Sequence, residues 1–135
     1  MLTVKPLESK QEQEAACARC AIPYEADDLA YGAYADGEFI GMCQFKVGEV
    51  GYIRDLVCAQ GTEDFEALFI MGRGTLNFID LCGVHTCRAR AGAAADRVLL
   101  AIGFRRQADG DWFADMSQMF TSPCQAGKQS APADT

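Results

Sequence analysis

The sequence predicts one α+β domain, with a mixed, mostly antiparallel sheet, a long central helix, and helices on both faces of the sheet. Three observations favour this class. An Asp36-Gly37 pair separates two segments rich in Tyr, Phe and Ile, which predicts a β-hairpin. A long apolar segment at 62–82 has the spacing of a helix that buries one face. The next segment, 85–91, predicts a strand parallel to the one before the helix, because a helical connection of this length can join parallel strands.

Ahead of the long helix, the residue pattern predicts a strand, a helix and three antiparallel strands. The first strand alternates weakly, and the first helix mixes Ala with Glu, Gln and Lys up to a boundary near Pro23. Gly48-Glu49 makes a second turn, so the last three strands form a meander. The expected ranges are 2–7 for the first strand, 8–20 for the helix, and 29–35, 38–47 and 50–58 for the meander.

The long helix carries two sets of apolar residues. One set forms a stripe at helical spacing: Phe65, Leu68, Phe69, Gly72, Leu76 and Ile79. The second set lies off that stripe: Ile70, Met71, Phe78 and Leu81. Such a helix is buried on more than one side, either under another element or in a subunit interface, so a homodimer is one expectation. Thr62 is the expected N-cap and Gly83 the expected C-cap.

The sequence of the C-terminal part of the domain predicts a short helix and two more strands. The helix spans 96–102 and ends at Gly103. The two strands, near 104–107 and 112–119, flank an Asp109-Gly110 turn. From Ser122 the chain is too poor in apolar residues to pack, so we expect a domain at 1–120 and a flexible polar tail at 121–135.

Charge and composition narrow the function classes. The chain has 135 residues, half of them apolar, and a formal charge of -7 from 12 basic and 19 acidic residues. This charge predicts no binding to nucleic acid or to anionic membranes, unless the basic residues cluster. The first residues lack the pattern of a signal peptide, and no apolar run approaches the ~18 residues of a membrane span. A cytoplasmic protein is therefore expected.

The seven cysteines are expected to be reduced. Most lie in apolar segments that lack the character of a disulfide scaffold. Cys17 and Cys20 form a C-x-x-C pair, and Cys82, His85 and Cys87 lie close together in the sequence, so a zinc site is one alternative. Nothing in the sequence holds the two groups together, and a redox C-x-x-C would precede a helix rather than end one. We therefore expect no metal site.

The order of elements, with three local segments, resembles the GCN5-related N-acetyltransferase (GNAT) superfamily over roughly residues 1–120. Ile53-Arg-Asp-Leu-Val-Cys58 is similar to the fourth strand of that family. Cys82-Gly83-Val84 resembles the end of its central helix, and Ala101-Ile-Gly-Phe104 its late Gly-Phe signature. The resemblance implies a GNAT-like fold and an acetyl-CoA-dependent N-acetyltransferase.

The resemblance also implies site residues. Acetyl-CoA would lie against the fourth strand at Leu56, Val57 and Cys58, with its pyrophosphate near the amides of Gly61 and Thr62. Asp55 is where the family often holds a general base, which would act on a small-molecule or peptide amine. The alternative for Asp55 is a solvated carboxylate or an ion-pair partner of Arg54 or Arg73.

Two departures weigh against this cofactor. The family's pyrophosphate loop, Q/R-x-x-G-x-G/A, needs small residues where this chain has Glu63 and Phe65. The carboxylates of Glu63, Asp64 and Glu66 would also repel a phosphate at the helix end. The family often has a proton-donating tyrosine on its last helix, and the matching residue here is Leu99.

Three tyrosines on neighbouring predicted strands, Tyr31, Tyr34 and Tyr52, are candidates for a substrate cleft or for ordinary packing. Two functions follow from the sequence. The first is an acyl-CoA-dependent N-acyltransferase with a divergent cofactor loop. The alternative is a non-catalytic GNAT-like module, used for binding or dimerisation, that no longer binds acetyl-CoA.

Overall fold

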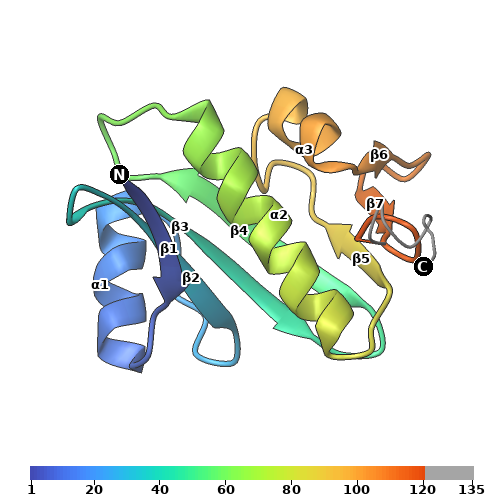
Figure 1. The fold of residues 1–135 in the computed structure, drawn as a ribbon, viewed down its shortest axis with the longest axis horizontal. Helices are drawn as coiled ribbons and strands as arrows, with labels where there is room; N and C mark the ends of the chain where they lie inside the picture. Colours follow the sequence, from blue (N-terminus) through green and yellow to red (C-terminus); the bar gives the residue numbers. More distant parts are fainter. Residues whose placement is uncertain (121–135) are drawn as a thin grey trace.

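Seven strands form one open sheet in the order β1-β2-β3-β4-β5-β7-β6 (Figure 1). The computed structural model describes residues 1–120, so the predicted tail lies outside the described residues. Strands β4 and β5 are parallel, and every other neighbouring pair is antiparallel. The elements are β1 (Leu2–Pro6), α1 (Lys10–Cys20), β2 (Leu29–Ala35), β3 (Glu38–Val47), β4 (Gly51–Cys58), α2 (Phe65–Leu81), β5 (Thr86–Ala89), α3 (Asp96–Ile102), β6 (Arg105–Arg106) and β7 (Trp112–Asp115).

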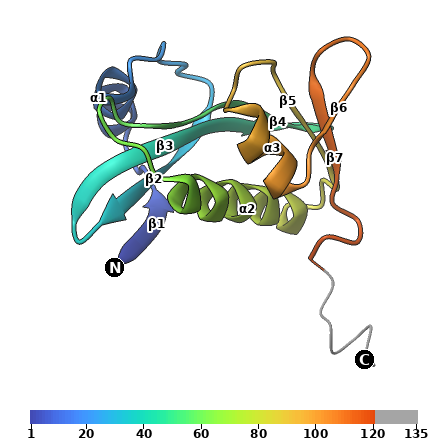
Figure 2. The ribbon, with the colours of Figure 1, turned by 90° about the horizontal axis from the view of Figure 1, so that it is seen from above.

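The helices cover both faces of the sheet. Helix α1 lies on one face, while α2 lies on the other with α3 beside it (Figures 1 and 2). A small core under α1 contains Cys17, Ala30 and Met42, all buried. The main core lies under α2 and α3, where Phe45 and Trp112 are among the largest buried side chains. The predicted α+β class, with a mostly antiparallel mixed sheet, is therefore confirmed.

The β2–β3 hairpin has the predicted bounds. Asp36 and Gly37 both adopt positive φ, at 51° and 87°. Such a pair makes the tight turn whose twist matches that of the two strands, and Asp-Gly is a preferred sequence for it. The last two strands, β6 and β7, are shorter than expected but flank the predicted turn, where Gly110 has φ 93°.

Helix α2 begins later than predicted. Its N-cap is Asp64, whose carboxylate accepts a hydrogen bond from the backbone N–H of Ala67 at 2.9 Å. The Thr62 prediction was wrong because two capping residues stand close together, and the Asp adds a charge that the helix dipole favours. Phe65 therefore sits in the first turn and is 38% exposed, whereas Met71, placed off the stripe, is fully buried.

None of the helices within residues 1–120 is long and apolar enough to cross a membrane.

Candidate functional site

Strands β4 and β5 pair over a short distance and then separate. Their register joins Gly51 to Cys87 and ends at Ile53 and Ala89. Beyond that point, the chain after β5 forms a turn of small residues against β4. The backbone N–H of Leu56 donates to the carbonyl of Ala93 at 2.8 Å. The remainder of β4 is thus free of a strand partner on this side.

A cleft of about 570 Å³ opens where the strands separate. It is bounded by the end of β4, the N-terminus of α2 and the start of α3. Four predicted cofactor residues line it: Leu56, Val57, Cys58 and Thr62. The fifth, Gly61, lines an adjoining shallow hollow together with Cys58 and Thr62. The fold therefore brings the five predicted residues to one place.

The α2 end of the cleft is acidic. Because Asp64 caps the helix with its own carboxylate, the N–H of Ala67 is already satisfied by an anion. Glu63 and Asp64 both line the cleft, and Glu66 lies in the first turn of α2. The helix terminus, which would otherwise attract a phosphate, is occupied and surrounded by like charge.

One cationic side chain lines the described cleft. The guanidinium of Arg97, on α3, lies 5.0 Å from the centroid of the Phe65 ring. This is a cation–π distance, so the two side chains hold each other at the mouth. The inner walls are apolar and include Leu68 and Val98.

Asp55 is buried and hydrogen-bonded at both carboxylate oxygens. It is 2% exposed. Nη2 of Arg90 donates to its Oδ1 at 2.8 Å, and Nε2 of Gln44 donates to its Oδ2 at 3.0 Å. The predicted alternatives named the wrong cation, because Arg54 pairs with the buried Asp28 instead. Each oxygen of Asp55 accepts one hydrogen bond, and the charge of Arg90 opposes protonation of the carboxylate, so Asp55 would accept a proton from an amine only after Arg90 moves.

A bulge in β4 explains where Asp55 points. The β3–β4 register shifts between Gln44 and Phe45, which leaves Arg54 as the extra residue. Because a bulge offsets the usual alternation, Ile53 and Leu56 both join the main core while Asp55 meets Gln44 on the α1 face.

The three tyrosines do not line one cleft. Tyr31 packs on Phe45 and Phe78 beside a separate pocket of about 240 Å³. Tyr34 contacts Phe39, in a hollow against α1. The ring of Tyr52 lies 5.3 Å from the guanidinium of Arg54. None of them lines the 570 Å³ cleft. Tyr31 and Tyr34 lie on opposite faces of β2, since Tyr31 packs on α2 and Tyr34 lies against α1.

The thiols of the described cysteines are free. Burial is the main cause that raises the pKa of Cys17 to about 11 and that of Cys20 to about 12. These thiols stay protonated at neutral pH, so they are poor nucleophiles and poor metal ligands. Within residues 1–120, no group of three or more His, Cys, Asp or Glu side chains is arranged to hold a metal ion.

Two residues of this site had no signal in the sequence analysis. Arg90 and Ala93 contact β4; Ala93 belongs to a segment of small residues, Ala91-Gly-Ala-Ala-Ala95, and Arg90 directly precedes it. A run of small residues directly after a strand is a signal of close backbone approach. Leu99, which replaces the family's tyrosine, is fully buried in the main core and has no proton to donate.

The strand order, the parallel β4–β5 pair and the cleft at the point of separation define the fold of the GCN5-related N-acetyltransferases. Solved structures with this fold include the ribosomal-protein-S18-alanine N-acetyltransferase of Escherichia coli, at TM-score 0.66 and 15% identity over 87% of this chain and 96% of that chain. A second is the PaiA N-acetyltransferase of Thermoplasma acidophilum, solved with coenzyme A. Its TM-score is 0.62 at 14% sequence identity, over 85% of this chain and 99% of that chain.

A third similar structure is the N-acetylglutamate synthase of Neisseria gonorrhoeae, complexed with coenzyme A and N-acetyl-glutamate. Its TM-score is 0.70 at 9% identity, over 87% of this chain and 36% of that one. The sequence matches no family model and no curated protein. The structural likeness establishes the GNAT fold of this chain.

The residues of the cleft fit one part of an acyl-CoA and not the other. The apolar walls and the strand backbone suit the acyl-pantetheine arm, which is uncharged. Two of the lining residues at the helix end, Glu63 and Asp64, do not suit a diphosphate. Arg97 is the side chain with the charge to meet a phosphate there.

Proposed function

We propose that this protein is an acyl-CoA-dependent N-acyltransferase that binds the acyl-pantetheine arm in the cleft between β4 and α3. The observation that carries the proposal is the cleft itself, placed where β4 loses its strand partner and large enough for a small ligand. The fold supports it, because similar structures include acetyltransferases solved with coenzyme A.

The strand backbone supplies the contacts to the arm. Because Leu56 directs its N–H toward the turn after β5, strand alternation directs the N–H of Cys58 the same way, toward the cleft. The backbone of Val57 pairs with β3, and Val57 also lines the cleft. The amides of Gly61 and Thr62 stand at the outer end, next to Glu63.

Asp55 is the residue we assign to proton removal from the acceptor, a small-molecule or peptide amine. Its burial and its bond to Arg90 hold the carboxylate in place and keep an amine from reaching it. The assignment therefore requires that Arg90 leave Asp55 when substrates bind. Arg97 is the residue we assign to the phosphate end of the cofactor.

The test is calorimetric titration of the reduced protein with acetyl-CoA, with desulfo-CoA as a control against exchange at the thiols. We expect saturable binding that salt does not weaken steeply, since Glu63 and Asp64 oppose the attraction of Arg97 for the phosphates. Absence of binding at millimolar ligand would overturn the proposal.

A second candidate is a non-catalytic module that binds or dimerises. The observation in its favour is that the protein's own groups fill three positions: Asp64 at the helix terminus, Arg90 on Asp55, and Ala93 on Leu56. Helix α2 also leaves Ile70 41% and Leu81 76% exposed. This candidate predicts a dimer in light scattering that Leu81→Lys converts to monomer, together with no acetyl-CoA binding by either variant.

A further inference from the structure

Trp112 is a buried donor without an acceptor. It is the only tryptophan of the chain and is 2% exposed. Its indole Nε1–H has no hydrogen-bond partner within residues 1–120. A buried N–H without a partner is unfavourable relative to one that is paired, and buried tryptophans usually find an acceptor. The position of this nitrogen therefore needs an explanation.

A short segment, residues 90–94, follows β5 and contacts β4; we call it the strap. Three backbone bonds shape it: Arg90 N to the carbonyl of Ile53 at 3.4 Å, Ala93 N to that of Arg90 at 3.0 Å, and Leu56 N to that of Ala93 at 2.8 Å. The salt bridge from Arg90 to Asp55 anchors one end. Gly92, at the turn, has φ 86°. The strap is thus bonded to β4 through Arg90 and through Ala93, and Gly92 between them has a positive φ.

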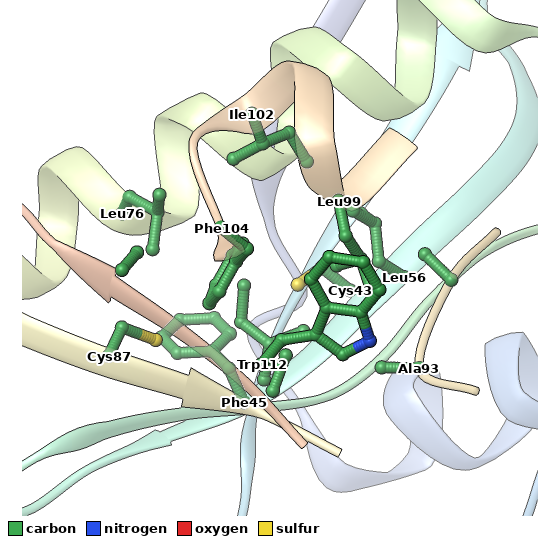
Figure 3. Packing of buried hydrophobic residues seen from close by; sticks show 14 of the residues in the cluster. Cys43, Phe45, Leu56, Leu76, Cys87, Ala93, Leu99, Ile102, Phe104 and Trp112 are labelled. Atoms are coloured by element: carbon green, nitrogen blue, oxygen red, sulfur yellow. The ribbon is translucent and has the colours of Figure 1, made fainter. Parts of the chain in front are cut away.

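The indole nitrogen points toward the strap. In Figure 3 the Nε1 of Trp112 lies on the side of the ring that faces Ala93, with Leu56 and Leu99 around it. Gly92 and Ala94, on either side of Ala93, line the cleft, and so does Leu56. The carbonyl of Ala93 accepts from Leu56 and leaves Trp112 unpaired. Of the two N–H donors in this region, Leu56 therefore has an acceptor and Trp112 has none.

We propose that the N–H of Leu56 and the Nε1–H of Trp112 form a two-donor site for the carbonyl oxygen of an acyl thioester, which takes the place that the Ala93 carbonyl holds in the structure. The inference rests on the proposed function and adds a specific donor to it. The incoming carbonyl has two lone pairs, so it can accept from both donors at once. The strap moves outward when the ligand binds, and this movement also separates Arg90 from Asp55.

The first experiment compares two ligands on two proteins. Acetyl-CoA carries the acyl carbonyl and CoA does not, and Trp112→Phe keeps an aromatic side chain, smaller than the indole, while removing the donor. We expect Trp112→Phe to weaken acetyl-CoA binding by about fivefold to tenfold, the worth of one hydrogen bond, and to leave CoA binding unchanged. Calorimetry of the reduced protein measures both.

The second experiment loosens the strap without touching either donor. Gly92→Ala strains the closed turn, because an alanine at φ 86° is unfavourable. We expect it to raise acetyl-CoA affinity by about fivefold, since less stability is lost when the strap opens. Gly110→Ala is the matched control, with φ 93° in the β6–β7 turn and open space around it. Fluorescence of the single tryptophan should shift on acetyl-CoA binding in the parent protein and in both glycine variants.

The outcomes separate the two claims. If the parent protein binds neither ligand, the proposed function fails and the inference fails with it. If both ligands bind, and Trp112→Phe changes them equally or not at all, the inference alone is overturned. A Gly92→Ala effect no larger than that of Gly110→Ala would also overturn it, because the strap would then not oppose binding.

Discussion

At the residue scale, Asp64 has two effects, one on the stability of α2 and one on the binding of an anion. It caps α2 through the N–H of Ala67, which stabilises the helix. Its charge also occupies the position of a bound anion, which opposes the phosphates of a cofactor. The two effects can be separated because asparagine is an equally good cap without a charge.

Stability tests the cap. Asp64→Ala should lower the free energy of unfolding by about 1 kcal/mol, because the N–H of Ala67 loses its acceptor. Asp64→Asn should lower it by no more than a few tenths of a kcal/mol. Urea denaturation measures both, and Glu63→Ala, at an exposed neighbour with no capping bond, is the control. An equal loss in the alanine and asparagine variants would show that the cap contributes nothing.

Ligand binding tests the charge. Asp64→Asn should raise CoA affinity by roughly twofold to fivefold at low salt, because one like charge is removed from the helix end. Pantetheine, which lacks the phosphates, should bind the parent and the variant equally. Calorimetry with both ligands checks this. A parallel gain for pantetheine would mean that Asp64 blocks the cleft by its shape and not by its charge.

At the scale of elements, two glycines of α2 have different roles. A Cβ on Gly72 would lie 2.3 Å from Cδ1 of Ile102 and 3.1 Å from Cδ2 of Leu56. Gly72 therefore lets α2 approach both α3 and β4, next to the cleft. A Cβ on Gly74 would meet nothing within 4 Å. The sequence analysis placed Gly72, and not Gly74, on the apolar stripe of this helix.

Alanine at these two positions of one helix should change the free energy of unfolding in opposite directions. Gly74→Ala should raise the free energy of unfolding by roughly 0.5–1 kcal/mol, because alanine has the better helix propensity. Gly72→Ala should lower it by about 1–3 kcal/mol, because Ile102 is fully buried and cannot yield to the added methyl group. Thermal or urea denaturation checks both. Stabilisation by both variants would contradict the close packing of α2 on α3.

The same elements show what the sequence could predict. The bounds of β2 and β3 were predicted correctly because the Asp-Gly turn and the strand pattern are local signals. The start of α2 was not, since Thr62 and Asp64 are both capping residues and the loop before them decides which one is used. The predicted cofactor residues meet at one cleft because β4 and the turn after it are continuous in sequence.

The small residues of the strap signal a close backbone approach, but the sequence does not show which residues the strap meets. Its contacts join Ala93 to Leu56 and Arg90 to Asp55, pairs far apart in the chain. No periodic pattern marks a segment of Ala and Gly, so its position depends on how β5 ends and α3 begins. The three tyrosines were grouped for a similar reason, because neighbouring strands do not reveal a bulge or which face a side chain takes.

At the scale of the whole molecule, the core contains free thiols where a protein of this size could use larger apolar groups. Cys43 and Cys87 are both fully buried in the main core. Burial is the first cause that raises the pKa of Cys43 to about 12, and it also raises the pKa of Cys87. The folded state therefore holds these thiols protonated at pH values where an unfolded chain would release the protons.

This difference predicts a loss of stability at alkaline pH. A thiol whose pKa is raised in the folded state gives stability that is complete below its unfolded pKa, near 8.5, and is lost as the pH rises toward the folded pKa. Between pH 9 and 10 each such thiol should lower the free energy of unfolding by up to about 1.4 kcal/mol per pH unit. Burial also raises the pKa of Tyr31 and Tyr34, so the range is kept below pH 10.

Urea denaturation under reducing conditions at several pH values between pH 8 and just below pH 10 measures the slope. Cys43→Ala should make it shallower by about one proton, even though the variant is less stable at every pH because of the cavity. Cys82→Ala, at an exposed position, is the control. An unchanged slope in Cys43→Ala would mean that water reaches this thiol during the titration, which would require the core between β3 and α2 to open well before the protein unfolds.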